Sequence, residues 1–203
     1  MGRKSYSVDT IFTYRPTIGD YAYLEDDVRD LVDSIVKDSI KPNRSLRYKR
    51  KELLPVHVDL WPYSWSDIIE LKDAIEEKNM LDALKLVYQI DERVFLKLDM
   101  FNAFAAYKWI TEMISEMNQT WNQWLGGDIS DEEKESGVED LNDFDYVVSL
   151  HTLANNDLLK YDAILAKPYS LIFRTLCLNK KIADIDKKRA ENASRKVKTN
   201  KRY

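Results

Sequence analysis

The sequence predicts a mainly α-helical protein, a helical bundle with an extended N-terminal arm, short strands at most, and a basic C-terminal tail. Three observations predict this fold class. Apolar residues recur at helical spacing through most of the 203 residues. The segments with this spacing begin at capping residues and end at glycine or proline. A hydrophobic fraction of 44% is ordinary for a globular protein and suits one domain or two small ones.

Residues 1–19 are the predicted extended arm. Between Ser5 and Arg15 every second residue is largely apolar or aromatic, and this period is typical of a strand or of an arm lying on another surface. Pro16 and Gly19 end it. Because the rest of the chain reads as helical, we expect the partner of this segment to be another subunit, and a flexible N-terminus is the alternative. The residues expected to make the contact between subunits are Tyr6, Val8, Phe12 and Tyr14.

Residues 20–127 are the predicted helical domain. Ser64, with Asp67 three residues later, has the pattern of a capping box, and Asn79 and Asp91 are further predicted N-caps. The connector between the first two helices carries a predicted short strand at Val56–Leu60. The predicted helices cover residues 20–40, 67–78, 80–90 and 92–125, and the last of them ends at Gly126-Gly127.

Residues 128–145 are a predicted acidic linker or loop. Nine acidic residues and one Lys make it a solvated charge run. A calcium loop counted from Asp128 has Glu133 at the position where the sharp turn needs Gly, so we favour the solvated loop.

Residues 146–186 are the predicted C-terminal helical segment, and residues 187–203 are the predicted basic tail. Helical patterns cover about 146–155 and 157–166. Pro168 suits the first position of a further helix, which frays into the tail from Lys187. The predicted core face of that helix is Leu171, Ile172, Leu176 and Ile182.

Positive charge is concentrated in two segments, residues 41–51 and the basic tail 187–203, although the formal net charge is −4. Residues 41–51 hold six basic and no acidic residues, and Tyr48 among them offers one ring for stacking. Neither segment contains a base-reading motif, so binding to a polyanion would be salt-sensitive and nonspecific. Docking onto an acidic protein and ordinary surface charge are the alternatives. The candidate polyanion contacts are Arg44, Arg47, Lys49, Arg50, Lys51, Lys187, Lys188, Arg189, Arg195, Lys196 and Lys198.

Motifs for catalysis and for cofactor binding are missing from the sequence. Its five glycines do not form a dinucleotide fingerprint or a P-loop, and no G-x-S-x-G occurs. The single Cys177 excludes an intramolecular disulfide and a cysteine zinc site, and we expect it to be buried and inert. His57 and Asp59 would share one face of a strand, but no nucleophile is placed beside them, and His151 reads as a packing residue. We therefore predict no enzymatic activity, no cofactor and no metal site.

The sequence also predicts no contact with a membrane. No apolar stretch approaches the roughly 18 residues of a membrane span. The first ten residues lack the apolar run of a signal peptide, so the expected location is cytoplasmic.

The stretch 161–191 resembles the C-terminal part of small helical bacteriophage proteins encoded among head and tail genes, some of which are described as tail assembly chaperones. The shared features are a short helix ending in Leu165, a helix start at Pro168-Tyr169, an apolar run and a charged helix. The resemblance covers about 30 of the 203 residues. It implies a structural or assembly role in a phage, in the host cytoplasm during assembly and then in the virion.

Three functional hypotheses follow. The leading one is a non-enzymatic virion component, such as a connector, ring, tail or internal protein, acting through protein–protein contacts. The second is a tail assembly chaperone that is absent from mature particles. The third is a small regulator that binds nucleic acid nonspecifically. The expected partners are further copies of the chain or other phage structural proteins, with nonspecific DNA contact in addition, and neither a membrane nor a small-molecule substrate.

Overall fold

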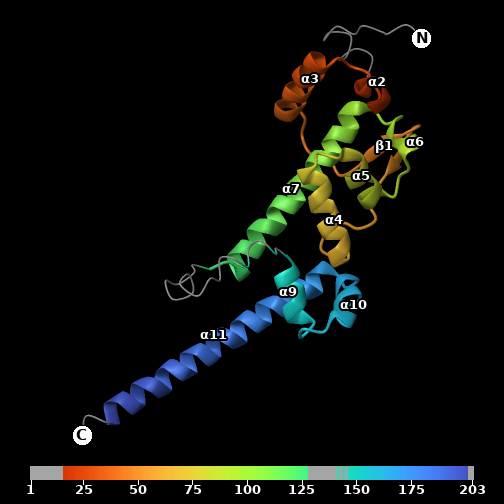
Figure 1. The fold of residues 1–203 in the computed structure, drawn as a ribbon. Coiled ribbons are helices and arrows are strands. Elements are labelled where there is room, and N and C mark those ends of the chain that lie inside the picture. The colour runs from red at the N-terminus through yellow and green to blue at the C-terminus, as the bar shows by residue number, and fades with distance from the viewer. Residues whose placement is uncertain (1–15, 128–140, 142–143, 145, 201–203) are drawn as a thin grey trace. The chain divides into compact units, whose positions relative to one another are not determined.

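The computed structural model describes residues 16–127, 141, 144 and 146–200. These residues are mainly α-helical, as predicted, and the sheet among them is a single antiparallel pair of strands (Figure 1). The chain divides into two compact units. Unit 1 comprises Met1–Leu60 and Asp67–Glu116, and unit 2 comprises Trp61–Ser66 and Met117–Tyr203.

Unit 1 begins with two helices where the sequence predicted one helix over 20–40. These are α2 (Ile18–Ala22) and α3 (Asp26–Ser39). Thr17 caps α2, and its side chain and that of Asp20 form a reciprocal capping box. The prediction was wrong because Thr17 starts a helix two residues early, inside the predicted arm, and this helix ends at Ala22 with Tyr23 as its C-cap.

The position of α2 is set by backbone pairing with a distant segment. The Ile18 amide donates to the Leu98 carbonyl at 3.0 Å, and the Met100 amide donates to the Pro16 carbonyl at 2.8 Å. Gly19 lies close to the same segment, since a Cβ there would be 3.0 Å from the Leu96 carbonyl oxygen. The end of the predicted arm is therefore bound to its own chain.

The predicted helix over 92–125 is also two helices, α6 (Glu92–Phe95) and α7 (Met100–Leu125). Asp91 caps α6 as predicted, because its carboxylate accepts from the Val94 amide at 2.7 Å. Asp99 then provides a second N-cap, accepting from the Asn102 amide at 3.0 Å. The helix ends at Leu125 as predicted.

The remaining helices of this region lie close to their predicted positions. They are α4 (Trp65–Glu76), which begins two residues before its predicted start, and α5 (Met80–Tyr88). The Asn79 side chain caps α5 by accepting from the Asp82 amide at 3.2 Å, as predicted. The predicted strand at Val56–Leu60 is wrong: these residues form bends, and the Val56 amide donates to the Val87 carbonyl at 3.0 Å.

The core of unit 1 forms where α4, α5 and the first part of α7 bury their apolar faces. Each of these helices carries apolar residues three and four apart, so one face is apolar and is removed from water. The fully buried core residues include Ile68, Leu71, Leu84, Val87, Leu98, Met100 and Ile110.

Unit 2 is organised around aromatic side chains. Its helical elements are the end of α7, α9 (Tyr146–Leu153), the 3-10 turn η2 (Leu158–Lys160), α10 (Tyr161–Leu165) and α11 (Tyr169–Asn200). The Trp121 and Tyr169 rings stack with centroids 5.9 Å apart, and Trp61 lies 5.2 Å from Phe173. Backbone bonds fix the start of α11, since the Tyr169 amide donates to the Tyr63 carbonyl at 2.8 Å.

The helix α11 is longer and more exposed than predicted. It continues through Lys187 to Asn200, so the first part of the predicted basic tail is helical (Figure 1). Ile172 is buried, whereas Leu171 and Ile182, which were predicted as core, are exposed. Leu171 lies beside Ile172 but on a different side of the helix, and Ile182 lies in the part of α11 where every residue from Lys181 to Ala193 is exposed.

Two further single-residue predictions were wrong. His151 is an exposed residue rather than a packing residue, and its Nδ1 lies 2.7 Å from the Tyr161 hydroxyl, which connects α9 to α10. Cys177 is only half-buried, although burial raises the pKa of its thiol.

Candidate functional site

The basic segment 41–51 folds into a hairpin rather than a loop. The strands β1 (Leu46–Tyr48) and β2 (Lys51–Leu53) are antiparallel, with Arg47 opposite Glu52 and Tyr48 opposite Lys51. Lys49 and Arg50 form the two-residue turn with φ values of 48° and 65°. Positive φ at both positions is typical of a type I′ turn, which favours Asn-Gly and is strained with two long side chains.

Contacts on both sides hold the base of this hairpin in unit 1. Leu46 is fully buried. The Asn43 amide donates to the Ala105 carbonyl at 3.0 Å, and the Tyr88 hydroxyl donates to the Arg44 carbonyl at 2.7 Å. The Lys108 ammonium donates to the Ile40 carbonyl at 2.9 Å. The basic tip is therefore presented on a fixed base.

The predicted basic residues of this segment do gather on the hairpin, with one correction. Arg47, Lys49, Arg50 and Lys51 are exposed, whereas Arg44 is half-buried. The Lys49 ammonium lies 5.2 Å from the centroid of the Tyr48 ring, a cation–π contact with one face of that ring. The hairpin therefore offers a polyanion four exposed charges.

The second basic group lies on α11, in unit 2. Lys187, Lys188 and Arg189 are exposed, and Arg189 pairs with Asp186 at 3.4 Å. Arg195, Lys196 and Lys198 belong to the same helix. The two predicted basic groups therefore belong to different units. The predicted arm residues Tyr6, Val8, Phe12 and Tyr14 lie outside the described residues.

The sequence prediction missed the most unusual surface of unit 2, a row of exposed apolar side chains along α11. We call it the α11 stripe; it consists of Leu171, Leu178, Ile182 and Ile185. Their exposed fractions are 50%, 58%, 49% and 40%. Every residue from Lys181 to Ala193 is exposed as well, so no apolar face of this part of the helix is buried. The sequence shows the apolar spacing of these residues, but not whether their own chain covers them.

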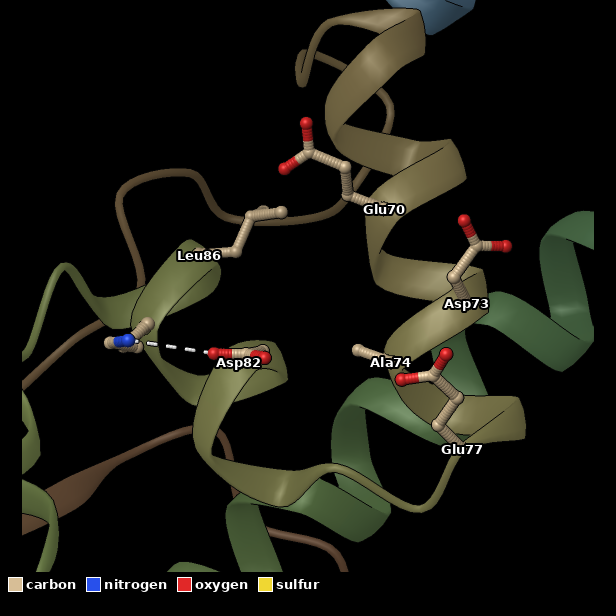
Figure 2. A pocket seen from close by; sticks show the side chains of 7 residues that line it. Glu70, Asp73, Ala74, Glu77, Asp82 and Leu86 are labelled. Atoms are coloured by element: carbon tan, nitrogen blue, oxygen red, sulfur yellow. Dashed lines mark hydrogen bonds and ion pairs between the residues drawn. The ribbon is translucent and has the colours of Figure 1, made fainter.

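An acidic groove lies between α4 and α5 in unit 1. It has a volume of about 500 Å³, and its lining includes Glu70, Glu77 and Asp82. Figure 2 shows Ala74 and Glu70 on α4 and Asp82 and Leu86 on α5, on the two sides of this groove. The Lys85 ammonium pairs with the Asp82 carboxylate at 3.5 Å. Across the described part of the chain, no group of three or more His, Cys, Asp or Glu side chains could hold a metal ion.

His57 and Asp59, considered above as an acid–base pair, are both half-buried and lie in the bends that follow β2. The strand that would have placed both side chains on one face is not formed, so their spacing in the sequence does not bring them together. No helix in the described residues is both long enough and apolar enough to cross a membrane.

Comparisons of the chain with protein families, with curated proteins and with solved structures found no match.

Proposed function

We propose that the protein is a non-enzymatic structural or assembly component of a bacteriophage particle, acting through protein–protein contacts. The observation that carries the contact role is the α11 stripe. Four Leu and Ile side chains on one helix are each at least 40% exposed. Contiguous exposed apolar surface on a soluble protein usually marks an interaction site, because covering it with another protein removes it from water.

The phage assignment has a separate basis. It depends on the resemblance of residues 161–191 to helical proteins of phage head and tail modules. That stretch contains the whole α11 stripe and the start of the helix that presents it. The two lines of support therefore concern the same part of the chain.

Copy number in purified particles of the source phage tests this proposal. We expect quantitative mass spectrometry to find the chain in finished particles at a fixed copy number set by the symmetry of a ring or tube. A chain that is abundant in infected-cell lysate but absent from particles would contradict a structural role, and would support the tail assembly chaperone instead.

A second candidate function is nonspecific contact with nucleic acid through the hairpin. It is favoured by the four exposed basic residues at and beside the turn. The matched test replaces Lys49 by Asn and Arg50 by Gly, which removes two charges but keeps a favoured turn. The control variant carries Arg93→Ala and Lys97→Ala, which removes two exposed charges elsewhere in unit 1.

We expect the hairpin variant to reduce the slope of log affinity against log salt for duplex DNA by about two, since each phosphate contact contributes about 0.9. The control should leave the slope unchanged. Equal slopes in the two variants, or no binding of the natural protein at low salt, would remove this function.

A further inference from the structure

The apolar residues of α11 follow a heptad spacing. Leu171, Leu178 and Ile185 are seven residues apart. Ile182 lies four residues after Leu178 and three residues before Ile185. In the nomenclature of coiled coils, the first three occupy d positions and Ile182 occupies an a position. This alternation keeps a narrow apolar seam on one side of a helix, and it is the pattern with which two helices pair.

We propose that the α11 stripe pairs with the same stripe of a second copy of the chain, as a short parallel two-stranded coiled coil. This inference rests on the proposed function, because it names the partner of the same surface. The stripe is open in the isolated chain, and the helix that carries it is exposed on all sides from Lys181 to Ala193. An exposed helix of this length gains little from its own propensity, and a partner helix on its seam would stabilise it.

The charges beside the seam determine the orientation of the pair. The g positions are occupied by Arg174, Lys181 and Lys188, and all three side chains are exposed. In an antiparallel pair these basic residues would face the same basic residues of the second helix, which is repulsive. In a parallel pair each g position faces the next e position of the second helix instead.

The e positions are Ile172, which is buried in unit 2, and the exposed Asn179 and Asp186, of which Asp186 carries a charge opposite to that of the g positions. Asn179 would face Arg174, and Asp186 would face Lys181, with the same contacts repeated by symmetry. In the isolated chain Asp186 pairs with Arg189 at 3.4 Å, with both side chains largely exposed. Such a surface pair is weak, so Asp186 is available for the contact with the second copy.

The composition of the seam favours two strands and sets its length. Ile182 at a with Leu171 and Leu178 at d is the combination typical of parallel dimers, and Ile185 is the one d residue that departs from it. Thr175 and Arg189 occupy the a positions before and after Ile182, so the apolar seam extends from Leu171 to Ile185. A seam this short predicts a reversible dimer that depends on chain concentration.

Cysteine cross-linking of the full chain tests the pairing and its orientation. In a Cys177→Ser background, Ile185→Cys places a thiol in the seam, and Asp184→Cys places one on the outer side as the matched control. Mild oxidation should convert Ile185→Cys to a disulfide-linked dimer at least about tenfold faster than Asp184→Cys. Equal rates for the two variants would overturn the parallel pairing.

Sedimentation equilibrium gives an independent readout with natural cysteine content. Ile182→Asp should raise the dimer dissociation constant at least about tenfold. At concentrations where both chains are monomeric, its circular dichroism should match that of the natural protein. Lys181→Asp alone should also weaken the dimer, and adding Asp186→Lys should restore it, since the pair is then reversed across the interface. A natural chain that is monomeric at all concentrations would overturn the inference.

Incorporation into particles separates this inference from the proposed function. If the chain is monomeric and Ile182→Asp still prevents its incorporation, the structural role stands and the stripe binds a different protein, such as a helix with acidic flanks. If the chain forms the parallel dimer but is absent from particles, the pairing stands and the structural role is wrong.

Discussion

The two long helices, α7 and α11, use their apolar residues in opposite ways. In α7, Ala103, Ala106 and Ile110 are completely buried in unit 1. In α11, Leu178 and Ile182 are about half exposed, although they are as apolar as the residues of α7. Apolar spacing therefore identifies a face that must be covered, but the covering surface can come from the same chain or from a partner.

The largest effect expected from this comparison is at the buried face of α7. Ile110→Asp places a charge at a completely buried position and should lower the free energy of unfolding by more than about 3 kcal/mol. Ile182→Asp is the matched change on α11 and should alter the stability of the monomer by no more than about 0.5 kcal/mol. Urea unfolding of both variants at low chain concentration measures the difference.

A large loss of stability from Ile182→Asp under those conditions would contradict this difference between α7 and α11. It would mean that the stripe is covered by the chain itself rather than open to a partner.

The two tryptophans near the end of α7 make the same comparison within one helix. Trp121 stacks on Tyr169 and contacts Phe173, whereas Trp124 is 60% exposed. Trp121→Ala should lower the free energy of unfolding by about 2 kcal/mol, because part of the aromatic core of unit 2 is lost. Trp124→Ala should have an effect of about 0.5 kcal/mol or less.

Thermal unfolding followed by near-ultraviolet circular dichroism measures these changes in unit 2. Equal effects of the two substitutions would show that stacking on Tyr169 contributes little to its core.

The elements that were predicted correctly from sequence are those with local causes. Asn79 and Asp91 cap helices because their side chains reach amides three residues ahead, and Gly126 follows the end of α7. The break between α6 and α7 was missed, although Asp99 caps the start of α7 in the same way. Apolar spacing continues through Leu98, and the break comes from backbone pairing of residues 96–100 with residues 16–19, which are distant in sequence.

The two candidate surfaces show the same limit. The composition of residues 41–51 identified the basic charge, but Lys49-Arg50 lacks the Asn or Gly that signals a tight hairpin, so the fold of the segment was missed. For α11, spacing alone grouped Leu171 and Ile182 with Ile172 on a core face. Only the structure separates the buried residue from the exposed ones, because only it shows which side and which part of the helix unit 2 covers.

A smaller effect is expected where α7 begins. Asp99→Ala removes the carboxylate that accepts the Asn102 amide and should lower the free energy of unfolding by about 1 kcal/mol. Asp184→Ala on the exposed part of α11 is the control, since that residue lies in mid-helix and caps nothing; its effect should stay within about 0.5 kcal/mol. Denaturant titration measures the free energy of unfolding of both variants. Equal values would contradict the role of Asp99 as a cap.

The smallest effect on the free energy of unfolding is expected from Tyr21, at alkaline pH. The Tyr21 ring of α2 packs edge-on against the Phe104 ring of α7, with centroids 5.4 Å apart. Burial and the hydrogen bond that its hydroxyl donates to Asp33 raise the pKa of Tyr21 above its ordinary value of about 10. The folded state thus holds the proton more tightly than the unfolded state does. Its contribution to stability is complete below pH 10 and is lost as the pH rises above that value.

Substitution by phenylalanine isolates this contribution. Tyr21→Phe keeps the ring contact with Phe104 but removes the ionisable group, so unfolding free energies measured between pH 9 and 11 should fall less steeply in this variant than in the natural protein. Tyr23→Phe is the matched control, because Tyr23 is 90% exposed and two residues away. If both variants followed the natural pH dependence, the hydroxyl of Tyr21 would not be coupled to folding, and the packing of α2 on α7 would depend on the ring alone.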